Sequence, residues 1–213
     1  MVENLARLGN TSQLLARLLI NRGIVEPEAA DRFLSATLAD LHDPFLLLGM
    51  EKGVARLAEA ARKGESVCVY GDYDVDGITS VALIIGFLRN IGVECFYHIP
   101  LRLEEGYGLS AEGVAGVAAK GARIIITVDC GITSVMEAEL CTSMGIDLII
   151  TDHHTPGDTI PPAFAVINPL QPGCPFPFKY LAGVGIAFNL MMALRSRLRK
   201  EGHFAARSEP NLR

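Results

Sequence analysis

Three apolar segments of this sequence end in carboxylate or imidazole side chains, and this pattern constrains the fold more than any other feature. Residues 66–70 run into Gly-Asp-Tyr-Asp-Val-Asp-Gly, with aspartates on alternate positions. A buried carboxylate without a partner is costly, so a positive group must lie among them. If the segments are parallel strands, their ends meet and the side chains converge on one divalent metal site. The side chains are Asp72, Asp74 and Asp76 after the first segment, Asp129 after the second, and Asp152, His153 and His154 after the third.

The pattern from residue 64 onward predicts an α/β fold. Continuous apolar strands that alternate with helices are typical of a parallel β-sheet with helices on both faces. The acidic and histidine residues stand at the carboxyl ends of these strands, where ligands collect in such sheets. The expected strands are 67–70, 93–99, 123–128, 147–151 and 164–167, and the expected helices are 77–91, 111–120, 134–144 and 181–200.

The chain is expected to have three parts. Residues 1–63 form a short helical N-terminal segment, since they show leucines at helical spacing, a proline near a helix start and glycines at helix ends. Residues 64–200 form the α/β domain. Residues 201–213 are a polar tail without clear structure. We expect no chemistry in the first part.

Composition sets wider bounds. The net charge of −5 argues against a nucleic-acid-binding surface, but several of the acids belong to the expected metal site, where bound cations offset part of that charge. The longest apolar runs, about 11 to 14 residues, are too short to span a bilayer. No secretion signal is visible. Five cysteines without a CxxC pair indicate reduced thiols in a cytoplasmic protein rather than a zinc ribbon.

The ligand types favour a hard divalent ion. Carboxylate oxygens suit Mg²⁺ and Mn²⁺, and imidazole from His153 or His154 shifts the preference toward manganese, iron or zinc over calcium. One carboxylate shared by two ions would give a two-metal site that activates water and holds a phosphoryl oxygen, and Asp129 is the candidate for that bridge. The alternative for Asp74 or Asp76 is that it caps the following helix, because aspartate is a favoured N-cap residue.

Other residues near the expected strand ends carry less specific signals. Asp152 precedes two adjacent histidines and is expected to orient one imidazole while the other contacts metal or substrate. Arg102 follows the second strand, where its guanidinium would hold a phosphate or pair with a glutamate in a surface loop. Gly183 and Gly185 open the last helix and indicate either backbone contact with a phosphate or close packing. The basic residues that end this helix fit the helix dipole, with strand binding as the alternative.

Together these residues resemble the DHH phosphoesterase superfamily, and within it the RecJ type of single-strand-specific exonuclease. The resemblance covers nearly the whole chain, and its motifs are specific in combination. They are Gly71-Asp72-Tyr73-Asp74-Val75-Asp76-Gly77, Thr127-Val128-Asp129-Cys130-Gly131, Thr151-Asp152-His153-His154, Glu105-Gly106-Tyr107-Gly108, Ile167-Asn168-Pro169 and Leu181-Ala182-Gly183-Val184-Gly185.

The resemblance implies a function and a set of roles. The activity would be manganese- or magnesium-dependent removal of nucleotides from the 5′ end of single-stranded DNA, in repair and recombination, with two ions in the complete protein. Water would attack phosphorus in line while the ions neutralise the developing charge. The residues that match metal ligands are Asp74, Asp76, Asp129 and His153. The residues that match the catalytic motifs are His154, near the scissile phosphate, Asp72 and Asp152.

One departure from the family pattern leads us to expect an N-terminal fragment. The family's fourth motif carries another aspartate ligand, and no aspartate follows Lys200 here. The second catalytic lobe and the OB-type DNA-binding module are also missing, so the isolated chain is expected to bind metal poorly and not to cleave DNA.

Two other functions stay open. A phosphodiesterase for small oligonucleotides or cyclic dinucleotides belongs to the same superfamily, but the N-terminal lead-in favours the RecJ type. A non-catalytic DNA-binding scaffold would be expected to lose ligands, and every motif here keeps its acids and histidines. A manganese pyrophosphatase of this superfamily is disfavoured, because Tyr70 stands where that enzyme has histidine.

Overall fold

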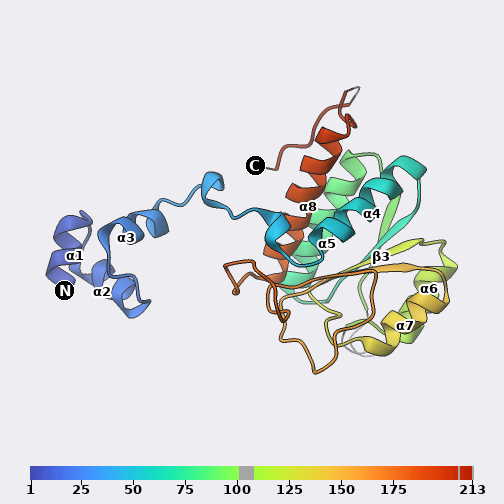
Figure 1. Cartoon of the computed structure of the whole chain (residues 1–213), viewed down its shortest axis with the longest axis horizontal. Helices are drawn as coiled ribbons and strands as arrows, with labels where there is room; N and C mark the ends of the chain where they lie inside the picture. The colour runs from blue at the N-terminus through green and yellow to red at the C-terminus, as the bar shows by residue number, and fades with distance from the viewer. Residues whose placement is uncertain (101–107, 206, 213) are drawn as a thin grey trace. The chain divides into compact units, whose positions relative to one another are not determined.

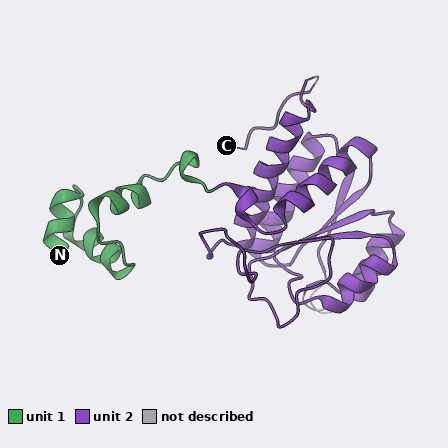
Figure 2. Ribbon diagram, in the orientation of Figure 1, with its two compact units in different colours: residues 1–42 green, residues 43–213 purple. Residues whose placement is uncertain are grey.

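The N-terminal residues form a small helical unit of their own. The computed structural model describes residues 1–100, 108–205 and 207–212, and the chain divides into two compact units, Met1–His42 and Asp43–Arg213 (Figure 2). Leu5 and Leu19 fill the core of the first unit. The Ser12 hydroxyl caps the second helix by accepting from the Leu15 N–H. The elements of this unit are α1 (Val2–Leu8), α2 (Gln13–Asn21), α3 (Pro27–Leu34) and a 3₁₀ turn, η1 (Leu38–Asp40).

The expected boundary at residue 63 differs from this division. Helix α4 (Met50–Lys63), with the 3₁₀ turn η2 (Pro44–Leu46) before it, belongs to the second unit. Its buried residues Met50, Val54 and Leu57 lie in the same hydrophobic core as the central strands. The sequence of this helix is polar on one face, like the helical segment before it, but its apolar face packs on the sheet.

The second unit contains a five-stranded, entirely parallel sheet in the order β2-β1-β3-β4-β5, which confirms the predicted fold class. The strands are β1 (Val67–Tyr70), β2 (Cys95–His98), β3 (Ile124–Val128), β4 (Asp147–Thr151) and β5 (Ala165–Ile167). The remaining helices are α5 (Val75–Asn90), α6 (Ala111–Ala119), α7 (Val135–Ser143) and α8 (Gly183–Lys200).

Alternate residues of each strand enter two separate cores. Val67 and Val69 of β1 pack with α4, α5 and α8, whereas Cys68 and Tyr70 pack with α6 and α7. Figure 1 shows the two groups of helices on opposite sides of the sheet. Because both faces are covered, the strands are apolar throughout, which explains why they appear in the sequence as continuous apolar runs.

The C-terminal segment packs against the second unit. The Arg207 guanidinium donates to the carbonyl of Ile91, and Leu212 contacts the core beside α8. The basic end of α8 faces acids: Arg199 pairs with Glu209, and Arg197 with Glu51. Residues 201–205 and 207–212 therefore pack against this unit without forming a regular element. No helix among the described residues combines the length and the apolar character needed to cross a bilayer.

Candidate metal centre

The strand order creates a crevice at the carboxyl edge of the sheet, between β1 and β3. The chain leaves β1 toward β2 on one side and returns to β3 on the other, and ligands bind where connections diverge in this way. Tyr70 pairs with Thr127, and Val128 with Thr151, so the three strands end at similar heights. The residues that follow these ends therefore meet.

The first motif is a short loop that runs directly into a helix. Helix α5 begins at Val75, two residues earlier than expected, because the Asp74 carboxylate caps it by accepting from the N–H groups of Asp76 and Gly77. These bonds, chiefly the one from Gly77, hold the pKa of Asp74 below its ordinary value. Gly77 is required sterically, since a Cβ there would lie 2.5 Å from the carbonyl oxygen of Asp72.

The carboxylate of Asp76 is held by the first turn of α8. Its two oxygens accept from the N–H groups of Gly183, at 2.6 Å, and Val184, at 2.7 Å. This places a negative charge at a helix N-terminus, where the macrodipole stabilises it. Oδ2 of Asp76 also lies 3.7 Å from Nε2 of His153. The motif and the start of α8, more than a hundred residues apart, therefore form one structure.

These contacts differ from the expectation that Gly183 and Gly185 bind substrate. The structure gives both N–H groups other partners, the Asp76 carboxylate for Gly183 and the Ala182 carbonyl for Gly185. Gly183 also packs closely, because a Cβ there would lie 2.7 Å from Oδ1 of Asp129. Gly183 therefore packs closely against Asp129, which is the other alternative that the sequence left open for this glycine. Arg102 lies outside the described residues.

Asp129 is the most constrained residue of the centre. It has a left-handed backbone (φ 61°) and is 2% exposed. Its buried Oδ1 accepts no hydrogen bond from the described residues, although Nε2 of His153 lies 3.0 Å away. Burial, together with the charges of Asp76 and Asp74, raises the pKa of Asp129 to about 7. A buried carboxylate oxygen without a donor, facing a ring nitrogen, is suited to hold a cation.

Asp152 orients the third motif rather than facing the crevice. One oxygen accepts from the N–H groups of His153 and His154 and lies 2.7 Å from Nδ1 of His154, and the other accepts from Ile132 N–H. Burial lowers the pKa of His154, but the bond to Asp152 and the nearby carboxylates outweigh it, so the pKa lies above its ordinary value. The contact between Nδ1 and Asp152 fixes the orientation of the His154 ring.

A residue without an assigned role, Asn168, holds the same motif from the other side. Its side chain is fully buried, donates through Nδ2 to the His154 carbonyl at 2.9 Å and accepts from the Leu170 N–H. The only signal for this role in the sequence was an asparagine directly after a predicted strand. It takes on this meaning only once β4 and β5 are known to be neighbours.

Two groups of potential ligand atoms result, and Asp129 belongs to both. Within each group the atoms lie no more than 4.8 Å apart. One group joins Asp129 to His153 and His154, and the other joins it to Asp72 and Asp74. Oxygen and imidazole donors at this spacing fit a divalent cation such as Mn²⁺ or Mg²⁺. When bound, such a cation supplies positive charge to a phosphoryl oxygen and lowers the pKa of water.

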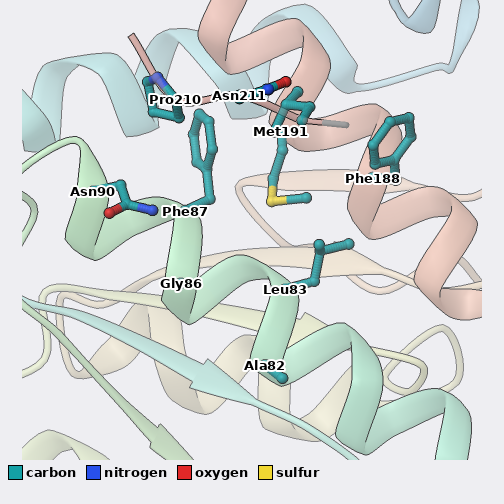
Figure 3. Close-up of a pocket in the computed structure, with 10 residues that line it drawn as sticks. Ala82, Leu83, Gly86, Phe87, Asn90, Phe188, Met191, Pro210 and Asn211 are labelled. Atoms are coloured by element: carbon teal, nitrogen blue, oxygen red, sulfur yellow. The ribbon is translucent and has the colours of Figure 1, made fainter. Parts of the chain in front are cut away.

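An apolar cavity of about 380 Å³ lies elsewhere in this unit, between α5, α8 and the C-terminal segment. Figure 3 shows Leu83 and Phe87 of α5 facing Phe188 and Met191 of α8 around it. None of the acids or histidines of the metal centre lines it. The candidate ligands at the strand ends therefore lie apart from this cavity.

Comparison with known proteins links this geometry to a family. Residues 66–209 match the model of the DHH family, N-terminal domain. The chain is 41% identical over 200 residues to the single-stranded-DNA-specific exonuclease RecJ of Bacillus subtilis, and 46% identical over 203 residues to that of Escherichia coli. These matches cover 94% and 93% of this chain. They cover 25% and 34% of the relatives, so the chain spans about a quarter to a third of the length of these curated proteins.

Solved structures agree. The structure of RecJ from Thermus thermophilus in complex with Mn²⁺ superposes with a TM-score of 0.74 at 31% identity, over 98% of this chain and 28% of that one. The complex of the same protein with Mg²⁺ gives 0.60 at 25% identity, over 98% and 24%. The whole chain, including its N-terminal helices, is therefore similar to part of a larger metal-bound protein.

Proposed function

We propose that the chain carries out metal-dependent phosphodiester hydrolysis on single-stranded DNA, as a 5′-to-3′ exonuclease in repair and recombination. The chain belongs to the DHH family, because residues 66–209 match the N-terminal domain of that family. The relatives' names supply the substrate, and the RecJ structures supply Mn²⁺ and Mg²⁺. The polarity and the biological setting rest on the family resemblance. Since the chain spans only part of its relatives, this activity is proposed for the protein that contains it.

One observation carries the proposal: Asp129 belongs to both groups of ligand atoms. A carboxylate in that position is suited to bridge two ions, and two-ion sites stabilise the attacking and leaving oxygens of an in-line displacement. Its buried, unpaired Oδ1 supports a cation at that point. The two ions, like the bridge, are part of the proposal.

The remaining residues receive roles from their contacts. Asp74 and His153 complete the two ligand groups, and Asp76 lies next to them while bound to α8. His154, whose side chain is 48% exposed, would contact the scissile phosphate. Asp72 lies in one ligand group. Asp152 acts through His154, as a positioning residue.

The first test is metal-dependent nucleotide release from 5′-phosphorylated single-stranded DNA. The protein that contains this chain is assayed for cleavage with Mn²⁺ and with EDTA. Its Mn²⁺ binding is measured in parallel by calorimetric titration. Asp129→Ala is compared with Asp158→Ala, which removes an exposed loop carboxylate. We expect Asp129→Ala to abolish Mn²⁺ binding and any cleavage, and Asp158→Ala to leave both unchanged.

The same assay separates this proposal from its competitors. Hydrolysis of dinucleotides but not of long strands would replace the exonuclease by a small-substrate phosphodiesterase. Strand binding that survives EDTA and Asp129→Ala, without hydrolysis, would indicate a scaffold. If the protein that contains this chain does not bind Mn²⁺, the metal mechanism fails.

A further inference from the structure

The segment between β5 and α8, residues 168–182, is attached to the metal centre at both ends. At its start, Asn168 donates to the carbonyl of His154. At its end, Gly183 donates to the carboxylate of Asp76, and a Cβ at this glycine would touch Asp129. We call residues 168–182 the anchored loop. Side chains near its two ends are therefore presented close to the metal centre.

The anchored loop is held along its length as well. The Lys179 ammonium donates to the carbonyls of Pro169 and Cys174, at 2.8 and 2.7 Å, which ties its far part to its beginning. Phe176 is 3% exposed and lies in the core with Cys174. Pro175 and Pro177 restrict the backbone between them. The loop is therefore preorganised, and its lysine is already occupied by the backbone.

Two aromatic side chains flank Lys179 and point into solvent. Tyr180 is 85% exposed and Phe178 is 48% exposed. Their rings meet edge to face, with centroids 6.1 Å apart. Single exposed apolar residues need no explanation, but two aromatics on a rigid loop beside a candidate catalytic centre form a surface with a defined shape.

Other exposed apolar side chains occupy the same edge of the sheet. Val75, between Asp74 and Asp76, is 78% exposed, and Ile78 in the next turn of α5 is 48% exposed. Both follow the carboxyl end of β1, as the anchored loop follows that of β5. This edge therefore combines charged ligand atoms with uncovered apolar and aromatic groups. A ligand that carries both phosphates and flat apolar rings matches that combination.

We propose that Phe178 and Tyr180 form a stacking platform for the bases of single-stranded DNA whose scissile phosphate lies at the metal centre. This inference rests on the proposed function and deepens it. Every base has a π-face, so stacking on aromatic side chains holds a strand without selecting its sequence. Bases within a duplex are already stacked on each other, so the platform selects single strands.

The number of residues between Tyr180 and Gly183 limits how far the platform can lie from the metal centre, and therefore which bases of the strand can reach it. Tyr180 precedes Gly183 by three residues, so their Cα atoms lie within about 11 Å, the fully extended limit. Lys179 brings the same part of the loop near Pro169, beside Asn168. The platform therefore holds the nucleotides nearest to the cleaved bond rather than a distant part of the strand.

Binding measurements with matched variants test the platform. The probe is a 5′-phosphorylated, phosphorothioate-linked oligothymidylate, measured by fluorescence anisotropy in Mn²⁺. Tyr180→Ala and Phe178→Ala are expected to weaken binding by about 5-fold to 100-fold each. Tyr180→Phe keeps the ring and is expected to bind as wild type, whereas Tyr180→Leu keeps apolar area without a ring and is expected to bind as weakly as alanine. Tyr97→Ala removes an exposed tyrosine from the edge strand β2 and is expected to be neutral.

A direct contact readout accompanies these variants. Oligonucleotides with 5-iododeoxyuridine at one of the first four positions are irradiated with the protein, and the crosslinked peptides are identified by mass spectrometry. Crosslinks to Tyr180 or Phe178 from these positions support the platform. Unchanged affinity of the alanine variants, together with crosslinks elsewhere, overturns it while the proposed function stands. If the protein that contains this chain neither binds nor cleaves single strands, the proposed function and the platform fail together.

Discussion

At the scale of single residues, Asp129 shows a conflict between stability and function. Its carboxyl is buried among other acids, and its raised pKa means that the folded protein disfavours the charged form. A raised pKa in the folded state contributes stability that is present below the unfolded value and is lost as the pH rises through the folded value. In the metal-free protein, Asp129 therefore contributes a loss of stability between pH about 4 and about 7.

Asp129→Asn is expected to remove this loss. In EDTA at pH 7.5 the variant should be more stable than wild type by about 1–3 kcal/mol, since the neutral amide has no charge to desolvate. At pH 4 the difference should nearly vanish. Urea denaturation at both pH values measures it, and added Mn²⁺ should stabilise only the wild type. A variant less stable than wild type at pH 7.5 would contradict this interpretation.

Gly183 offers a second test at this scale. In Gly183→Ala the new Cβ would lie 2.7 Å from Oδ1 of Asp129, so the carboxylate or the start of α8 must shift. We expect a loss of about 1–3 kcal/mol in stability and weaker Mn²⁺ binding in calorimetry. Gly116→Ala in α6 is the control, because nothing lies within 4 Å of its Cβ and alanine favours helix. Equal effects of the two substitutions would show that the close approach has no consequence.

The sequence was sufficient to predict that the acids and histidines lie close together, because the strands of a parallel sheet have their carboxyl ends at the same edge. It did not reveal that Asp76 binds the first turn of α8, or that Asn168 supports His154. Those contacts depend on which strands are neighbours and where a distant helix begins. The left-handed backbone of Asp129 was also hidden, because aspartate adopts this conformation only occasionally.

At the scale of elements, the two edges of the sheet have different tasks. The candidate ligands lie at the carboxyl edge. At the amino edge, Arg56 of α4 forms ion pairs with residues at the starts of two strands. Its guanidinium is 9% exposed and bonds Glu65, just before β1, and Asp147, the first residue of β4. This explains why α4 belongs with the sheet, and the helical pattern of residues 50–63 contained no hint of it. The strand positions were predicted to within two residues because the strands other than β2 are buried almost continuously.

Arg56→Leu is expected to lower stability by about 1–3 kcal/mol, because two carboxylates lose their partner at partly buried positions. Mn²⁺ affinity should stay unchanged, since the substitution lies at the opposite edge from the metal centre. Thermal unfolding and Mn²⁺ titration measure the two quantities. Lys63→Ala breaks an exposed pair with Glu59 and should cost less than about 0.5 kcal/mol. A parallel loss of Mn²⁺ affinity in Arg56→Leu would show that the two edges are coupled.

At the scale of the whole molecule, the two compact units predict a simple deletion experiment. Residues 43–213 contain both large cores and every candidate ligand among the described residues. This segment should unfold cooperatively without residues 1–42 and should keep the Mn²⁺-induced rise in Tm. Residues 1–42 alone are too short to bury a sufficient core and should be largely unfolded by circular dichroism. Loss of cooperative unfolding in the 43–213 segment would contradict the division.

The bond between Asp76 and the first turn of α8 has a consequence for the order of events during synthesis. The ribosome synthesises Asp72 about 110 residues before Gly183. At ordinary translation rates this separation corresponds to an interval of about 5–20 s. During that interval the nascent chain lacks the helix whose first turn later holds Asp76, and for most of it the chain also lacks His153 and His154. The bond that holds Asp76 is therefore the last of these contacts that can form during synthesis.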